Sequence, residues 1–349
     1  MLLSHAGHTS RKSSLFQPPL FQEKIEKYAQ ATLKRFRAMT RREALFHLLF
    51  SLLSLTEIVF FITFFSFFTH TSILAFTLAG FFLTAFTYLI LHFYFQSQKP
   101  EQLTSLQRDF TEKCRDLIPY NRGSSQHHLS LAHALYNCVA IFHSQEYFYY
   151  PTPSGWESLS SVIQKLSCWS HWKELHKMKE LLLQQAIQEH YELIKNIPTD
   201  LEAHASLAQA HLLLSKLYLN PQKLAPEEEI PWVPKEYLSE AMGEKLLASS
   251  WRAIEEFKIV DSFAPNDPWV HAQLRTIYAD LDLRQEEIAI CEKLLKLVPK
   301  DRDLLFRLGV LYLKEGLYAK GLTLYDKLLK EEDPRAEELI SHYGNFLDA

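Results

Sequence analysis

Residues 44–95 form an apolar segment that holds one formally charged side chain, Glu57, and 14 of the chain's 24 phenylalanines. A helix needs about 20 apolar residues to cross a bilayer, so this segment has room for two crossings. The polar stretch at residues 69–72 divides it. We predict a transmembrane hairpin with helices over about residues 47–68 and 73–95. A buried helix pair of a soluble protein is the alternative, but such helices keep a polar face that this segment lacks.

Basic residues flank the apolar segment on both sides. Residues 1–43 carry nine Lys or Arg against three acids, and Lys99, Arg108, Lys113 and Arg115 follow the segment. The stretch between the two apolar lobes has neither Lys nor Arg. Because positive charge is retained on the inner side during insertion, we expect an integral membrane protein with both termini on the cytoplasmic side of a bacterial-type membrane.

The amino-terminal residues 1–43 are expected to be partly disordered, with an amphipathic basic helix over residues 20–43. Ile25, Leu33 and Phe36 fall near one face of that helix, among Lys and Arg. Such a helix can lie on an anionic lipid surface. The alternative is a positive flank that only fixes the topology.

Glu57 is expected near the middle of the first membrane helix. A carboxylate there costs about 2.5–3.5 kcal/mol on insertion scales. One interpretation is a protonated side chain bonded to Thr or Ser on the second helix, or to a second copy of the chain. The other is a working group in a subunit of an oligomeric channel or transporter.

A helix end followed by Pro-x-Asp recurs along the rest of the chain. It occurs at Pro198, Pro265 and Pro299, and Pro334 ends the series; the last three are 34 and 35 residues apart. A period near 34 residues is a repeat signature. Proline ends the second helix of each unit, and the aspartate that follows is placed to cap the next helix.

The aligned blocks share small and large residues at fixed positions, and this pattern resembles the tetratricopeptide repeat (TPR) family. The positions that carry it are Leu274, Tyr278, Leu308, Gly309, Tyr312, Ala253, Phe257, Pro265 and Pro299. The resemblance implies an all-α fold, with a helical linker or capping region over residues 96–166 and a TPR-like solenoid over residues 167–349. Residues 220–236 form an inserted loop, and an extra helix is expected from Tyr237.

Some positions depart from the family pattern. Glu287 and Gly321 stand where alanine is usual, and Arg275 stands where a small residue is usual. These departures leave the block at residues 302–335 as the best-formed repeat.

The resemblance also implies a groove lined by first-helix residues that binds a protein or peptide partner. By position these are Trp269, Ala272, Thr276, Ala279, Asp303, Phe306, Val310 and Leu313.

Other functions find little support in the sequence. Only 9 glycines are present, and neither phosphate-binding glycine motif occurs. Residues 96–349 carry 28 Lys or Arg against 37 acids, which argues against nucleic acid as a partner. We expect no enzyme activity, no cofactor and no metal; a homo-oligomer is possible but unsupported.

Two groups of residues have a functional and a structural interpretation. The aromatic stretch at residues 147–150 is either a docking patch or a loop pinned beneath the helices, and we favour the loop. Several His and Cys invite a metal site, but without a recognised motif we expect them to pack in the core. They are His127, His128, His133, Cys168, His171 and His176.

These features together predict a membrane-anchored TPR scaffold or adaptor that mediates protein–protein interactions. The short two-lobed hairpin also resembles the inclusion-membrane proteins of chlamydia-like bacteria, which are exported by type III secretion. That resemblance implies an alternative, a secreted protein of an inclusion membrane that exposes its solenoid to host cytosol. The polar start of the chain is compatible with such an export signal.

Overall fold

A computed structural model describes residues 19–68, 73–143, 145–150, 155, 157–224 and 233–343. Every regular element among these residues is a helix, as predicted for an all-α chain. The chain divides into two units, Met1–Glu189 and His190–Ala349, which are described separately below. The predicted disordered start and export signal, at residues 1–18, lie outside the described residues, as does the predicted hairpin turn at residues 69–72.

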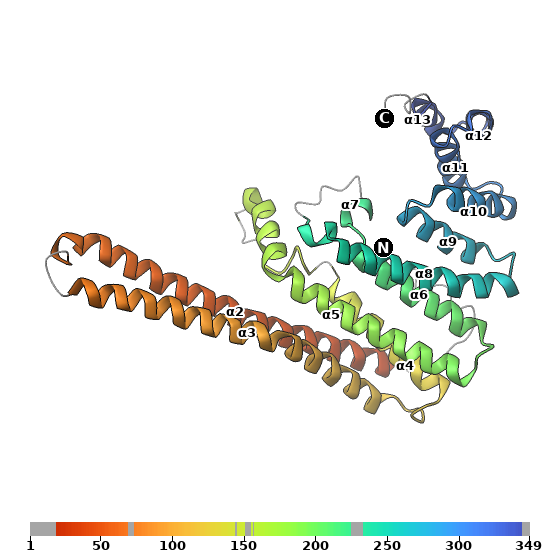
Figure 1. Cartoon of the computed structure of the whole chain (residues 1–349). Helices are drawn as coiled ribbons and strands as arrows, with labels where there is room; N and C mark the ends of the chain where they lie inside the picture. Colours follow the sequence, from red (N-terminus) through yellow and green to blue (C-terminus); the bar gives the residue numbers. More distant parts are fainter. Residues whose placement is uncertain are drawn as a thin grey trace. The chain divides into compact units, whose positions relative to one another are not determined.

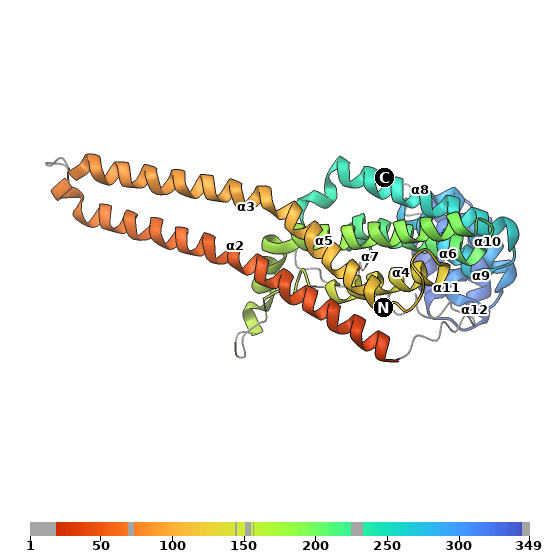
Figure 2. The same ribbon diagram turned by 90° about the horizontal axis from the view of Figure 1, so that it is seen from below.

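The first unit is built on two long helices, α2 (Pro19–Phe68) and α3 (Ile73–Leu117), which run side by side as a hairpin (Figures 1 and 2). The two predicted membrane helices are therefore the outer parts of longer helices. An interior proline removes one helical hydrogen bond and costs about 3 kcal/mol, yet α3 continues through Pro100.

The inner parts of α2 and α3 pack with α4 (Ser125–Phe142) into a core that we call the base. Ile25, Phe36, Phe110 and Phe142 are at most 1% exposed. The rings of Phe36 and Phe142 meet edge to face, with centroids 5.4 Å apart. The apolar face of residues 20–43 is thus covered by protein, which contradicts the lipid-bound helix, one of the two interpretations of this segment.

The remaining elements of the first unit are the short η1 (Glu157–Leu159) and most of α5 (Ser160–Asn196). The expected domain boundaries after residues 43, 95 and 166 each fall inside a continuous helix, α2, α3 and α5 respectively. Hydropathy changes at residues 43 and 95, but the helices continue through both points.

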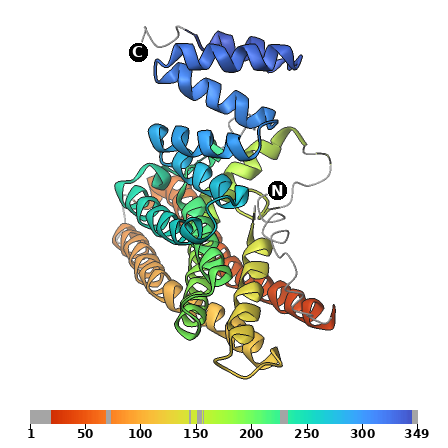
Figure 3. The same ribbon diagram turned by 90° about the vertical axis from the view of Figure 1, so that its right-hand side faces the viewer.

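The second unit is a row of antiparallel helix pairs, α6 with α8, α9 with α10, and α11 with α12, ended by α13 (Figure 3). Their bounds are α6 Leu201–Tyr218, α8 Glu240–Phe263, α9 Pro268–Asp280, α10 Arg284–Leu297, α11 Arg302–Lys314, α12 Tyr318–Lys330 and α13 Arg335–Ser341. This arrangement is a TPR-like solenoid.

The aspartates of the Pro-x-Asp motifs cap the helices that follow them, as predicted. The carboxylate of Asp200 accepts from the Glu202 amide (3.0 Å), that of Asp267 from the Trp269 amide (2.9 Å), and that of Asp301 from an amide one turn on. Each cap satisfies an amide that has no partner within its own helix.

The turns inside the last two pairs repeat with the sequence period. The Leu283 amide donates to the Tyr278 carbonyl (2.9 Å), and the Leu317 amide donates to the Tyr312 carbonyl (2.8 Å), 34 residues later. Between these partners Asp282 and Gly316 adopt positive φ angles of 56° and 73°. The shared geometry closes each first helix and turns the chain back.

The insert in the first pair differs from its prediction. It holds the short α7 (Pro221–Leu224) and η2 (Lys235–Leu238), and residues 225–232 lie outside the described residues. The extra helix expected from Tyr237 is wrong, because α8 starts at Glu240 and continues to Phe263. The second helix of this pair has 24 residues against 14 and 13 in its counterparts, so part of the apparent insertion is helix and the rest is the connection between α6 and α8.

Two glycines give a matched test of repeat packing. A Cβ at Gly321 would lie 2.6 Å from Leu313 Cδ2 and 2.9 Å from its Cγ, whereas one at Gly243 would meet nothing within 4 Å. Alanine is the better helix former by about 0.5–1 kcal/mol. We expect Gly243→Ala to stabilise the chain by about 0.5 kcal/mol and Gly321→Ala to destabilise it by about 1–3 kcal/mol. Denaturant unfolding followed by circular dichroism measures both; equal shifts for the two variants would contradict the packing.

Candidate functional site

The outer part of the α2–α3 hairpin is covered by exposed apolar side chains. The helices are long and apolar enough to cross a membrane, judged by length and composition, and none of the residues in their most apolar windows is buried. Phe76 is 80% exposed and Phe82 is 75% exposed. A core helix of a soluble protein would instead bury these residues. Apolar surface on this scale marks a site of contact with a membrane or a protein.

Glu57 lies on this hairpin and meets the second helix. Its Oε1 accepts a hydrogen bond from the Thr84 hydroxyl (2.7 Å), while Oε2 is buried without a hydrogen bond. This is the Thr contact that one of the two sequence interpretations anticipated. It joins the helices through a polar group in an otherwise apolar seam.

A polar cluster lies where the apolar segment meets the base. Lys99 donates to both Glu43 and Glu174 at 2.6 Å, and His47 lies 3.2 Å from the Tyr88 hydroxyl. Burial alone would lower the pKa of Lys99, but its hydrogen bonds to the two carboxylates outweigh burial and raise it. Lys99 therefore stays charged at neutral pH, and the cluster marks the inner limit of the exposed apolar surface.

The aromatic stretch at residues 147–150 is mostly pinned to the base. Tyr149 is 7% exposed and shares a hydrogen bond with Thr40, and the Tyr150 hydroxyl lies 2.8 Å from His171 Nε2. These contacts confirm the loop interpretation for both tyrosines. Phe148 is the exception, at 60% exposed.

The His and Cys candidates are dispersed. Within the described residues, no group of three or more His, Cys, Asp or Glu is placed to hold a metal ion. His128 Nδ1 lies 2.7 Å from Glu189, and the ring of His176 packs on Trp172 with centroids 4.8 Å apart. Cys168 is fully buried. These side chains therefore have packing contacts in the first unit.

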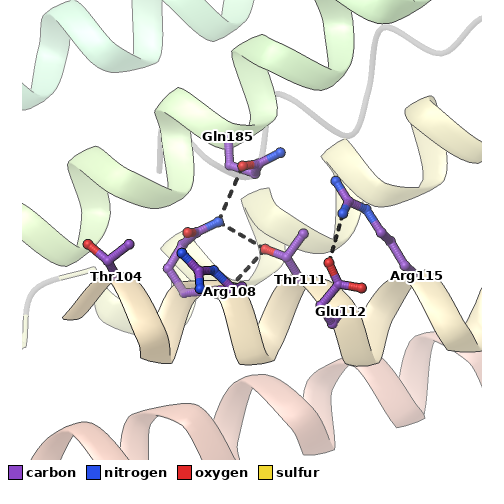
Figure 4. Close-up of a pocket in the computed structure, with 7 residues that line it drawn as sticks. Thr104, Arg108, Thr111, Glu112, Arg115 and Gln185 are labelled. Carbon is purple, nitrogen blue, oxygen red and sulfur yellow. Dashed lines mark hydrogen bonds and ion pairs between the residues drawn. The ribbon is translucent and has the colours of Figure 1, made fainter. Parts of the chain in front are cut away.

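A shallow polar pocket of about 300 Å³ opens between α3 and α5 (Figure 4). Gln107 Nε2 donates to the Thr111 hydroxyl (3.0 Å) and lies 3.5 Å from Gln185 Oε1. Arg115 pairs with Glu112 and with Glu189. Polar residues spaced three and four apart along α3 form this face, a pattern that the sequence interpretation did not use. Gln107 and Arg115 of α3 both reach polar side chains of α5, so the pocket lies at a helix–helix contact.

The predicted groove residues of the solenoid divide into two groups. Trp269, Ala272, Thr276 and Ala279 on α9 are partly exposed, but Val310 and Leu313 on α11 are 5% and 1% exposed. Their side chains lie in the core around α11, so neither lines a surface in this structure. The positions taken from the family pattern therefore assigned two core residues to the groove.

Asp303 and Phe306, the other two predicted groove residues, are both held by α13. Arg335 donates to Asp303 and lies over the Phe306 ring, 5.7 Å from its centroid. At this end of the solenoid both of these predicted groove residues therefore contact Arg335 of α13.

The residues assigned to repeat packing have the burial that this role requires. Leu274, Tyr278, Leu308, Tyr312, Ala253 and Phe257 are at most 7% exposed, and Gly309 is buried. A Cβ at Gly309 would lie 2.8 Å from Leu339 of α13, so this glycine allows the terminal helix to approach. Pro265 and Pro299 are exposed and follow the ends of α8 and α10.

The departure at Glu287 has a structural reason. Its carboxylate is 2% exposed and accepts two hydrogen bonds from Arg307, at 2.7 and 2.9 Å. This fork joins α10 to α11 across the repeat boundary. A charged pair with two bonds replaces the small residue that the family pattern has there.

No protein-family model matches the chain, and no curated protein matches it. Among solved structures it is similar to the crystal structure of the P58(IPK) TPR domain, with 14% identity over 92% of this chain and 99% of that chain and a TM-score of 0.20. At this identity and TM-score, the solenoid assignment depends on the helix pairs of the chain itself.

The Glu57–Thr84 bond predicts a specific pattern of variant stabilities. Thr84→Val removes the donor, and we expect it to weaken the hairpin in lipid by about 0.5–2 kcal/mol. Thr77→Val is the matched control, because the Thr77 hydroxyl bonds only a carbonyl of its own helix. Glu57→Gln keeps an acceptor and should stay near the native value, whereas Glu57→Leu should match Thr84→Val.

This series can be measured as energy transfer between dyes at Leu52→Cys and Leu89→Cys while the detergent composition is varied. Equal stability of the Thr84 and Thr77 variants would show that the bond does not hold the helices together.

Proposed function

We propose that the chain is a membrane-anchored scaffold whose hairpin crosses a lipid bilayer and whose helical repeats bind a protein partner. The single observation that carries this proposal is the change in side-chain exposure along α2 and α3. The same two helices are packed in the base and bare along residues 45–65 and 74–94. A bilayer is the environment that covers such a surface on all sides.

The side of the membrane on which the base lies follows from charge. The base end of the hairpin carries the exposed Arg41 and Arg42 and the ion cluster of Lys99. Positive residues at this end favour retention on the cytoplasmic side. We infer that the base and the solenoid are both cytoplasmic, because no further apolar span was found in the described part of the chain after α3.

Glu57 is given a packing role in this proposal. Its bond to Thr84 within the same chain supports a role in packing the two helices rather than a role in conducting ions. The alternative of a secreted inclusion-membrane protein depends on hydropathy and on residues 1–18, which lie outside the described residues.

The partner face is assigned to the first helices of the repeats. Thr276 on α9 is partly exposed, and its hydroxyl bonds only its own helix, to the Ala272 carbonyl (3.0 Å). With Trp269 and the two alanines it makes a mostly apolar surface of small relief. Such a face suits the apolar side of a partner helix or an extended peptide.

The topology is tested by single cysteines at Lys24→Cys and His70→Cys in oriented membrane vesicles. A maleimide that cannot cross the bilayer should label Lys24→Cys only from the cytoplasmic face and His70→Cys only from the opposite face. Labelling of both from one face would overturn the hairpin.

The native thiols provide a low background for that test. All four cysteines are buried, and burial raises the pKa of Cys114 and of Cys291 to about 12. The reactive thiolate is therefore scarce at neutral pH. The unsubstituted chain is the control and should stay unlabelled from both faces.

The partner face is tested by two arginine substitutions. The partner is first identified by photocrosslinking from position 276 of the full chain in its native membrane. Thr276→Arg should weaken its binding roughly ten-fold or more, since a charge would enter an apolar contact. Ala289→Arg, at an exposed position on α10, is the matched control and should bind as the native chain does. Equal affinity of the two variants would reassign the partner to another face.

A further inference from the structure

The first turns of α5, in the same unit as the hairpin, expose a second apolar face. Val162 is 59% exposed, Leu166 is 51% and Trp169 is 72%, and Leu159 in η1 just before them is 40%. Their spacing of three and four residues places them on one side of the helix. A face of this size on an otherwise folded unit indicates a contact that the isolated chain does not make.

The opposite side of the same turns is fixed to the base. Cys168 and Leu175 are fully buried, Trp172 is 6% exposed, and the Tyr150 amide donates to the Ser167 hydroxyl (3.2 Å). This part of α5 therefore carries apolar residues both on its packed side and on its exposed side.

The direction of α5 brings these turns toward the apolar part of the hairpin. Three pairs join α5 to α3 in the same order along both helices: Lys99 with Glu174, Gln107 with Gln185, and Arg115 with Glu189. The two helices thus run in the same direction through the base. The apolar segment of α3 comes before Lys99 in the chain. The residues of α5 before Glu174 therefore lie toward that apolar segment.

A second set of contacts fixes the level of these turns along α2. The ring of Tyr149 packs on His171 with centroids 3.8 Å apart, and its hydroxyl donates to the Arg37 carbonyl (3.3 Å). His171 is therefore level with the end of the base, a few residues before the apolar segment of α2 begins. In Figures 1 and 2 the first turns of α5, in yellow-green, run across the long direction of the hairpin.

Two exposed lysines, Lys165 and Lys173, lie in the same stretch as this face. Residues 158–173 contain no acid; Glu157 and Glu174 flank them, and Glu174 is paired with Lys99. Arg41 and Arg42 are exposed at the same level on α2. Basic residues beside an apolar face favour an anionic lipid surface, and tryptophan is enriched at the membrane–water interface.

We propose that residues 159–173 form an interfacial helix, with Val162, Leu166 and Trp169 inserted among the headgroups and upper acyl chains of an anionic bilayer. This proposal depends on the hairpin crossing that bilayer. The hairpin and this helix then hold the base at the membrane by two separate contacts, so the base cannot turn freely about the hairpin.

The test uses the full chain with single environment-sensitive labels in vesicles of equal parts phosphatidylcholine and phosphatidylglycerol. The label is placed at Leu166→Cys, with Phe82→Cys as the deep reference and Asp116→Cys on the far end of α3 as the aqueous reference. All three positions are exposed, so labelling leaves the packing intact. Quenching is then measured with lipids that carry a nitroxide near the headgroup or deep in the chain.

We expect the shallow nitroxide to remove roughly half or more of the Leu166 emission and to leave the Asp116 emission unchanged. The deep nitroxide should quench Phe82 more strongly than Leu166. A repeat in phosphatidylcholine alone should give weaker quenching at Leu166, because the lysines lose their anionic partners.

Two results would overturn the proposal, and they are distinguishable. If Phe82 is quenched but Leu166 is not, the hairpin stands and the interfacial helix fails. A Leu166 label that is shielded from aqueous iodide, yet unquenched by lipid, would show that protein covers this face. If Phe82 itself is unquenched, the membrane crossing fails and the interfacial helix fails with it.

Discussion

The structure of the first unit depends on two uninterrupted helices that are covered over one half of their length and bare over the other. Ile25 and Phe36 of α2 and Phe110 of α3 pack with α4, and they hold the helices side by side before the apolar segment begins. The packed half fixes the geometry of the bare half. Because the backbone does not break between them, any environment that covers the hairpin also orients the base.

The border between the two halves is chemically distinct. The ion cluster of Lys99, Glu43 and Glu174 joins all three long helices at the point where apolar exposure starts. Inside the segment Glu57 is bonded to Thr84, so its carboxyl is used within the hairpin. Polar groups at the border, and a carboxyl inside that bonds the neighbouring helix through one of its oxygens, are compatible with a spanning segment.

Much of this could be predicted from the sequence, because period and composition report directly on what a helix buries. The hairpin followed from the length of the apolar segment, and the solenoid from the 34-residue spacing of Pro265 and Pro299. The caps at Asp267 and Asp301 followed from the same motif. These features are local, so a single sequence is enough to define them.

The predictions that failed concern what covers a given face of a helix. For the apolar face of Ile25 and Phe36, a lipid surface stayed open as one of two interpretations, because an amphipathic pattern does not say what covers it. Val310 and Leu313 were assigned to the groove by a register that only the packed repeat corrects. The single α8 was missed because Tyr237 follows a proline-rich stretch, where helix starts are ambiguous. The exposed apolar face of α5 was missed because the exposed side and the packed side of its first turns both carry apolar residues.

The central claim is that the bare half of α2 and α3 is buried in a bilayer. Alkaline extraction of membranes that contain the full chain tests it most directly, because high pH releases proteins held only by charge. We predict that the chain stays in the membrane pellet and floats with lipid on a density gradient. Release of the chain into the soluble fraction would contradict the membrane hairpin and require a protein to cover its apolar surface.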